Sequence, residues 1–257
     1  MILKIKSSVV IITTIWIYFF TLTVHLLLIQ FENARNFLGL TMFIPLFTVI
    51  IYQYMFKKIP IRHTFAIKKT KVSTIIICIL LPLFLGFAMH LYFYLTSKGY
   101  FLFIDLHQLI PLLLIGISIS SISAFLEEVV WRGNYHYYLR QRYNVWKTAC
   151  ITGVIWSLWH LPIAIFYKPY LHPSATITSY LLILFFISYI LTFLREKEKS
   201  VFPVAILHGM LNVFYLSDGT KMKVSVDQLE MEKCILMAII FLVMVLFLLK
   251  KSSYSDK

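Results

Sequence analysis

Charged residues are scarce in this chain. Lysine, arginine, aspartate and glutamate together make up 14% of its 257 residues, whereas apolar residues make up 60%. In soluble globular domains about a quarter of the residues are charged, so this composition excludes a water-soluble protein. The long apolar runs have the length of membrane-spanning helices, which need about 20 residues each. We therefore expect an integral membrane protein.

The sequence also lacks alternating apolar and polar segments and a cysteine framework. A membrane β-barrel needs strands of about ten residues that alternate in polarity, but these runs are apolar on all sides, which is typical of helices. Only three cysteines occur, and they lie far apart inside apolar runs: Cys78, Cys150 and Cys234. This pattern indicates neither a disulfide framework nor a cysteine-rich metal site.

The apolar runs predict a single all-α domain over residues 1–257, a polytopic bundle of about eight transmembrane helices. The first run is too long for a signal peptide and has no small-residue cleavage site, so we interpret it as a span. Boundaries predicted from such runs are accurate to a few residues. The predicted spans are 9–29, 37–56, 72–96, 109–131, 146–167, 176–194, 201–216 and 233–249.

The chain has 24 basic and 11 acidic residues, and the basic residues lie mainly between the spans. This placement favours anionic lipids over nucleic acid as a partner. If the spans alternate in direction, 18 basic residues lie on the side of both termini and 6 on the other. Positively charged segments stay in the cytoplasm, so we expect both termini to be cytoplasmic. The frequent use of Ile, Phe, Tyr and Lys points to a bacterial cell membrane.

Two adjacent carboxylates lie at the end of the fourth predicted span. Nine of the eleven acidic residues lie in connections or tails, and the other two are Glu127 and Glu128. A carboxylate within a span is costly unless it has a partner or faces a wet cavity, so it is a functional candidate. Arg132 follows Glu128 by one helical turn, where an ion pair can form. An ordinary pair at the headgroups would account for Glu128 but leaves Glu127 unexplained.

Two further polar clusters have helical spacing. In the fifth span, Trp156 and His160 are four residues apart and share one helix face. In the seventh span, His208 and Asn212 have the same spacing, and Gly209 leaves room for close approach of another helix. Each cluster alone is a weak signal, because a histidine within a span more often makes a hydrogen bond between helices.

The first two clusters are expected at the same depth. A hairpin turn near Asn144 lies 16 residues after Glu128 and 16 residues before His160. Because a helix rises about 1.5 Å per residue, an antiparallel hairpin brings these two side chains level. The depth of His208 does not follow from its position in the short seventh span.

The segments EEVVWR (127–132), WSLWH (156–160) and HGMLN (208–212) resemble, in order and spacing, the three motifs of the CPBP family of intramembrane proteases. This family includes the type-two CAAX prenyl endopeptidases and bacterial relatives associated with bacteriocin self-immunity. Its pattern is E-E-x-x-x-R, then F-x-x-x-H, then H-x-x-x-N or D. The departure here is Trp156, where the family most often has phenylalanine. The resemblance covers about residues 109–216.

The resemblance implies an intramembrane endopeptidase that hydrolyses peptide bonds near the cytoplasmic membrane face. Its substrate would be a membrane-associated peptide or protein, CAAX-like or bacteriocin-related. In this pattern, Glu127 is the general base, His160 is its partner in activating a water, and His208 and Asn212 stabilise the oxyanion. Glu128 and Arg132 support the site by orienting the helix end. We expect the four catalytic candidates to line one polar cavity that is open to the cytoplasm.

Two questions stay open at the level of sequence. The first is the cofactor: Glu127, His160 and His208 are enough to bind Zn²⁺ with one open position, whereas a glutamic mechanism needs no cofactor. The sequence has no H-E-x-x-H motif, and Asn212 favours the metal-free mechanism because an amide is a poor zinc ligand. Two other classes of protein fit the same residues. One is a non-enzymatic membrane immunity or binding protein, and the other is a redox or transport protein that uses His160 and His208.

Overall fold

The computed structural model describes residues 2–56, 60–101, 105–217 and 222–255. Within these ranges the chain forms an all-α bundle. Two of its connections are joined by an isolated β-bridge between Gly99 and Met222. The elements are α1 (Ile2–Leu28), η1 (Ala34–Met42), α2 (Phe43–Phe56), α3 (Ile61–Phe65), α4 (Val72–Leu95), α5 (Leu106–Ile115), η3 (Gly116–Ser120), α6 (Ser121–Glu128), η4 (Val129–Tyr135), α7 (His136–Leu139), α8 (Val145–Trp159), α9 (Leu161–Phe166), α10 (Pro173–Glu198), α11 (Phe202–Leu211), η5 (Asn212–Leu216) and α12 (Val226–Ser255).

Seven helical stretches of the described residues are long and apolar enough to cross a membrane. They match seven of the eight predicted spans, and large apolar side chains such as Phe84 and Val243 are exposed on their outer faces. Such surfaces require lipid, so the chain is an integral membrane protein. The remaining predicted span, 201–216, is a shorter apolar helix formed by α11 and η5. Its 15 residues extend about 22 Å, less than the roughly 30 Å of a bilayer core.

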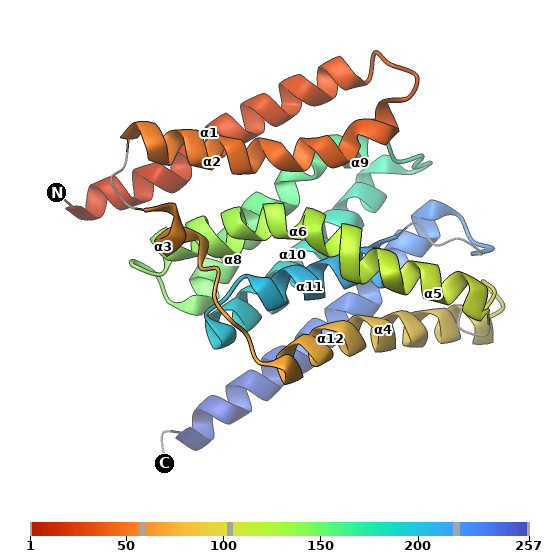
Figure 1. The fold of residues 1–257 in the computed structure, drawn as a ribbon. Coiled ribbons are helices and arrows are strands. Elements are labelled where there is room, and N and C mark those ends of the chain that lie inside the picture. The colour runs from red at the N-terminus through yellow and green to blue at the C-terminus, as the bar shows by residue number, and fades with distance from the viewer. Residues whose placement is uncertain (1, 57–59, 102–104, 218–221, 256–257) are drawn as a thin grey trace.

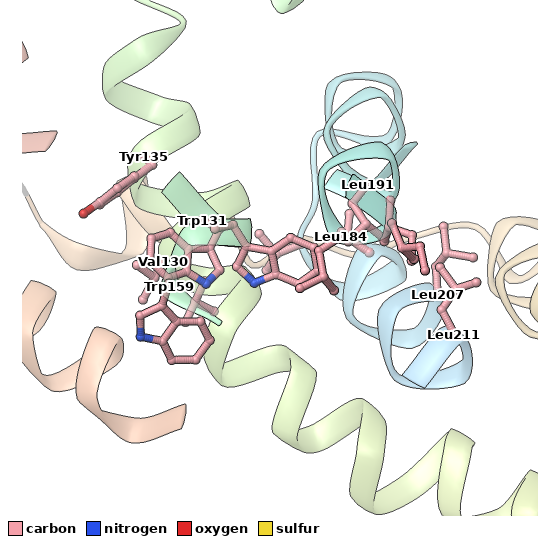
Figure 2. Close-up of a cluster of buried hydrophobic side chains, with 14 of the residues drawn as sticks. Val130, Trp131, Tyr135, Trp159, Leu184, Leu191, Leu207 and Leu211 are labelled. Atoms are coloured by element: carbon pink, nitrogen blue, oxygen red, sulfur yellow. The ribbon is translucent and has the colours of Figure 1, made fainter. Parts of the chain in front are cut away.

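The helices that carry the three motifs lie in the middle of the bundle. Figure 1 shows α6, α8, α10 and α11 between α1 and α2 on one side and α4 and α12 on the other, where α4 contacts α11 and α12 contacts α10. Aromatic and leucine side chains fill the space between them (Figure 2). Trp131 is fully buried, and its ring lies 5.7 Å from that of Trp159. The site is therefore held by the most enclosed part of the fold.

The fourth span is longer than predicted. The sequence predicted its end at residue 131, but the helix continues to Leu139 and includes two π-helical segments, η3 and η4. Segment η4 begins at Val129, directly after the paired carboxylates. Such widened turns are frequent at functional sites. One consequence is that Arg132 lies inside the bundle, not at the headgroups.

The bundle has two ends, which we name by their charge. The basic end contains the described ends of the chain, Ile2 and Ser255, and the connections 60–71, 140–144 and 199–201, where Val201 N–H donates to the Ala66 carbonyl at 3.1 Å. The neutral end contains Ser217 and the connections 29–33, 96–101, 167–172 and 222–225, where Lys223 N–H donates to the Lys98 carbonyl at 2.8 Å. In Figure 1 the basic end is on the left, where α1 begins and α12 ends.

Gly209 allows α11 to touch α6. A Cβ atom at this position would lie 2.5 Å from the Cα of Ser121, and the Ser120 hydroxyl donates to the Gly209 carbonyl at 2.9 Å. We expect Gly209→Ala to lower the free energy of unfolding by about 1–3 kcal/mol, because overpacking forces the two backbones apart. Thermal unfolding of the purified protein measures this effect. Gly39→Ala is the control, since no atom lies within 4 Å of its added Cβ; equal losses in the two variants would contradict the packing role.

Candidate active site

A cavity of about 250 Å³ lies among α6, α8, α10 and α11. Its wall includes all four side chains that the motifs single out as catalytic candidates, together with polar and apolar neighbours. The lining residues are Met42, Ser123, Glu127, His160, Ile163, Lys168, Tyr180, Leu184, His208, Asn212, Leu216 and Ser217. The structure therefore brings the candidate residues of the three motifs to one cavity, and their chemical roles stay predictions.

Glu127 is held by an indole group. Its side chain lies on α6 and the residue is only 3% exposed. Its Oε2 accepts a hydrogen bond of 2.8 Å from Nε1 of Trp156. The sequence interpretation treated Trp156 only as a bulky aromatic in place of phenylalanine and missed this bond. A phenylalanine has no donor to offer at this position.

His160 has a defined ring orientation. Helix α8 ends at Trp159 because Pro162 begins the next helical turn, which leaves His160 at the junction of α8 and α9. Its Nδ1 lies 2.9 Å from the Trp156 carbonyl. A carbonyl only accepts, so Nδ1 carries the proton and Nε2 of the neutral ring is an acceptor. The rings of Trp156 and Trp159 pack edge-on against the imidazole at 5.0 and 4.8 Å.

Glu128 joins the first motif to the third. Its Oε1 accepts from Nδ1 of His208 at 2.8 Å and from the Arg132 guanidinium at 2.9 Å. The Arg132 guanidinium also donates to the Ser188 hydroxyl of α10 at 2.8 Å and lies 4.7 Å from the Trp156 ring centre. Glu128 and Arg132 are fully buried. The sequence predicted the Glu128–Arg132 pair but neither His208 nor Ser188 as a partner.

Asn212 lies one turn after His208, and both line the cavity, as their spacing predicted. The π-helical segment η5 begins at Asn212 and ends the short helix at Leu216. His208 is 2% exposed, whereas Asn212 is half-buried. The third motif thus offers an imidazole and an amide to any group that enters the cavity.

The candidate zinc ligands do not fit a metal ion. Within the part of the chain that the structure describes, no three His, Cys, Asp or Glu side chains converge closely enough to hold one. Oε2 of Glu127 accepts the Trp156 indole N–H, whereas the Nδ1 contacts of His160 and His208 with a carbonyl and a carboxylate leave the Nε2 atom of each ring for a ligand.

The cavity lies on the side of the neutral end. Lys168 and Ser217, which line it, lie at that end, and none of the lining residues belongs to a basic-end connection. The sequence predicted cytoplasmic termini and a cavity open to the cytoplasm, and both stay predictions.

Comparison with known proteins finds a family model that resembles the part of the chain carrying this site. Residues 107–214, about two-fifths of the chain, match the family model described as type II CAAX prenyl endopeptidase Rce1-like. We refer to this part as the Rce1-like segment, because it is similar to that family. It is also similar to CAAX prenyl protease 2 of Methanococcus maripaludis, with 30% identity over 98 residues. That alignment covers 36% of this chain and 36% of the relative, so the match spans about a third of each protein.

The Rce1-like segment contains a matched pair of tryptophans that tests the Glu127 contact. If the cavity hydrolyses peptide bonds, we expect Trp156→Phe to lower kcat/KM about tenfold or more, because a hydrogen bond to a charged group contributes about 1.5–3 kcal/mol. Peptide cleavage by the purified protein measures this change. Trp159→Phe is the control, since Nε1 of Trp159 donates to the Thr21 hydroxyl at 2.9 Å and not to Glu127. Equal losses in the two variants would show that the indole bond has no special role.

Proposed function

We propose that the chain is an intramembrane endopeptidase that hydrolyses a peptide bond of a membrane-associated substrate in the cavity. The observation that supports this most is that Glu127, His160, His208 and Asn212 line one cavity within the Rce1-like segment. A CAAX-like C-terminus is the substrate class favoured by the family, and a bacteriocin-related peptide is the alternative. Anionic headgroups are the expected partners of the basic end.

In the proposed reaction, the Glu127 carboxylate removes a proton from a water molecule. The water also donates a hydrogen bond to Nε2 of His160, which is an acceptor because Nδ1 binds the Trp156 carbonyl. The water oxygen attacks the peptide carbon, and a C–O bond forms while the carbonyl π pair moves to the oxygen. The protonated Glu127 then gives its proton to the amide nitrogen as the C–N bond breaks. The products are a carboxylic acid and an amine.

The developing oxyanion is stabilised by the third motif. The amide of Asn212 donates one hydrogen bond. His208 donates from Nε2 while its Nδ1 donates to Glu128, so it must carry both protons. The Glu128 carboxylate stabilises this cation, and Arg132 and Ser188 hold Glu128 in place. Each donor aimed at the oxyanion lowers the activation barrier by about 3–4 kcal/mol.

Metal dependence is tested with the purified protein. We expect protein that has been treated with chelator and contains less than about a tenth of an equivalent of metal to keep full activity, since carboxylate, imidazole and amide groups carry the proposed reaction. Metal analysis and cleavage assays on the same sample measure this. Loss of activity on chelation with recovery on addition of Zn²⁺ would contradict the metal-free reaction and restore zinc as the cofactor.

The function itself is tested by substrate accumulation. Membrane peptides from cells that carry the wild-type chain and from cells that carry Glu127→Gln are compared by mass spectrometry. We expect at least one membrane peptide to accumulate uncleaved in the variant, and the purified wild-type protein to cleave that peptide in liposomes. A farnesylated CAAX peptide in the same liposomes tests the CAAX-like class. Identical peptide profiles, together with no cleavage of the farnesylated CAAX peptide, would favour a non-enzymatic immunity or binding protein.

A further inference from the structure

A second cavity lies between α1, α7 and α8. Its volume is about 290 Å³, close to the lower limit for ligand pockets, and it shares none of its described lining residues with the cavity of the candidate active site. The part between α1 and α8 is mostly apolar and is lined by Val10, Ile11, Thr14, Ile15, Ile151 and Ile155. Ile11 and Ile15 are 58% and 61% exposed. The cavity is therefore a groove on the surface that faces lipid.

The inner part of this groove suits a hydrocarbon chain. The Thr14 hydroxyl is already paired, since it donates to the Val10 carbonyl at 2.7 Å and lies 2.9 Å from the Tyr135 hydroxyl. Three residues beyond Ile15, the Tyr18 hydroxyl donates to the Ile155 carbonyl at 2.7 Å and ties α1 to α8. A hydrocarbon chain gains free energy from apolar contact and needs no hydrogen bond, so it fits between these two helices.

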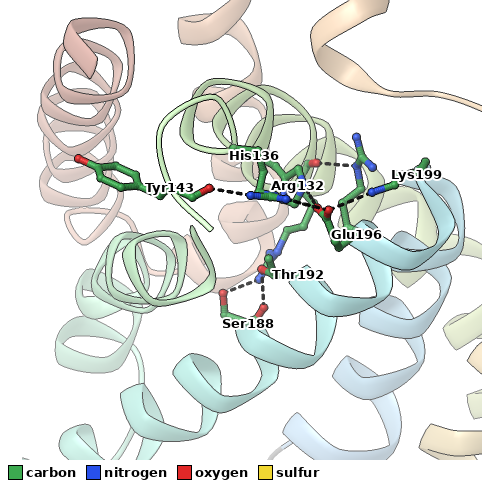
Figure 3. Close-up of polar contacts among 9 residues, drawn as sticks. Arg132, His136, Tyr143, Ser188, Thr192, Glu196 and Lys199 are labelled. Atoms are coloured by element: carbon green, nitrogen blue, oxygen red, sulfur yellow. Dashed lines mark hydrogen bonds and ion pairs between the residues drawn. The ribbon is translucent and has the colours of Figure 1, made fainter. Parts of the chain in front are cut away.

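The other part of the groove lies at the connection 140–144 and is basic. Figure 3 shows the polar contacts that hold this connection, in which the Tyr143 carbonyl accepts from the Arg140 guanidinium at 2.6 Å. Arg140 also pairs with Glu196 at 3.1 Å, so its charge is compensated. The charges of Arg142 and Lys147 are not compensated in this way.

These two exposed cations lie on either side of one aromatic ring. The Arg142 guanidinium is 5.4 Å from the centre of the Tyr143 ring, and the Lys147 ammonium is 4.6 Å from it. Among the described residues, neither cation has an acidic partner. Tyrosine and basic side chains are enriched at the level of the lipid headgroups, and a guanidinium binds a phosphate through two parallel hydrogen bonds. This part of the groove therefore complements an anionic headgroup.

From these two parts we infer that the groove binds an anionic phospholipid, with an acyl chain between α1 and α8 and the phosphate at Arg142. A zwitterionic lipid can fill the apolar part equally well, but its own ammonium group opposes the two cations. The bound lipid connects α1 to α8, the helix that carries Trp156. The lipid site does not depend on the proposed peptidase reaction.

Native mass spectrometry of the purified full chain tests the headgroup. The protein is titrated in detergent micelles with phosphatidylglycerol or with phosphatidylcholine of the same acyl chains, and the dissociation constant of the first bound lipid is measured. We expect the wild type to prefer phosphatidylglycerol, and Arg142→Gln to weaken that lipid about fivefold without changing phosphatidylcholine, because one basic residue beside anionic headgroups contributes about this factor.

Arg62→Gln is the matched control for the headgroup. Arg62 is also exposed and lies on α3 at the same end of the bundle, away from the groove. We expect it to keep the wild-type preference. Equal losses in the two variants would show only a general attraction to the basic end and would overturn the inference, as would equal affinity of the wild type for the two lipids.

Blocking the groove tests the acyl chain. Ile11→Trp places a larger ring at the wall, whereas Ile77→Trp makes the same change on the outer face of α4, where Ile77 is 59% exposed. We expect Ile11→Trp to weaken the first phosphatidylglycerol about tenfold, because losing contact with two methylene groups is enough for this change. Ile77→Trp should have no effect. Equal effects of the two variants would place the chain outside the groove and overturn the inference.

Thermal unfolding keeps the test valid if Arg142→Gln does not fold. A ligand that binds only the folded chain raises the unfolding temperature. We expect phosphatidylglycerol to raise the unfolding temperature of the wild type more than phosphatidylcholine does, and this difference to shrink in Lys147→Gln, which removes the second cation beside Tyr143. The same shift with both lipids in the wild type, or an unchanged difference in Lys147→Gln, would overturn the inference.

Discussion

Glu127→Gln is expected to abolish peptide cleavage while the chain still folds and inserts into the membrane. Glutamine has nearly the same shape, and its carbonyl oxygen can still accept the hydrogen bond that Trp156 donates to Glu127 at 2.8 Å. It cannot take a proton from water, and general-base catalysis contributes about 100- to 10,000-fold to a rate. We therefore expect kcat/KM to fall about 1,000-fold or more, with an unchanged unfolding temperature. Cleavage of a membrane peptide and thermal unfolding, measured on the same preparation, check both parts.

Asn212→Ala is the matched comparison for this result. Asn212 lines the same cavity but does not handle a proton in the proposed reaction. We expect its removal to cost less than Glu127→Gln, because the other oxyanion donor, His208, remains. Wild-type activity in Glu127→Gln would end the assignment of Glu127 as general base. A smaller loss in Glu127→Gln than in Asn212→Ala would shift the main catalytic role to the oxyanion donors.

Much of the site could be predicted because helical spacing translates directly into geometry. His208 and Asn212 are four residues apart on one helix, and both line the cavity. Asn144 caps α8, because its side chain accepts a hydrogen bond of 2.9 Å from Lys147 N–H. The turn at this residue brings α6 and α8 together at the level of Glu127 and Trp156. These relations depend only on distance along the chain.

The partners of the motif residues could not be predicted in the same way. The bond between Glu128 and His208 depends on how far α11 slides along α6, which is fixed by contact between Gly209 and Ser121. Ser188, which binds Arg132, stands in an apolar span without any motif. The span 176–194 also contains Ser179, and a serine in such a span carries no signal of its own.

The contacts at the end of the seventh helix were also hidden in the sequence. The seventh predicted span looked like a short membrane crossing, and nothing in its residues indicates that Lys233 of α12 binds its last carbonyls. The position of Arg132 was misjudged for a related reason. The apolar run ends before Arg132, but the helix does not, because Glu128 and Ser188 satisfy the guanidinium inside the bundle.

Glu128→Gln is expected to have the largest effect on stability. Glu128 and Arg132 are both fully buried and lie 2.9 Å apart. Removal of one partner of a buried ion pair leaves the other charge uncompensated and costs about 3–5 kcal/mol. The unfolding transition of the purified protein in mixed micelles measures this loss. Lys199→Gln is the control, because Lys199 is 60% exposed in its pair with Glu196, and such surface pairs contribute at most about 1 kcal/mol.

The double variant Glu128→Gln, Arg132→Met separates the support of the fold from the support of the reaction. It removes both buried charges, and replacing a buried pair by groups of similar volume is often neutral, so we expect most of the lost stability to return. Activity should stay low, because His208 no longer has a carboxylate to stabilise its doubly protonated form. Recovery of cleavage together with stability would show that Glu128 only neutralises Arg132. Recovery of neither would show that Arg132 holds Ser188 and α10 in place independently of its charge.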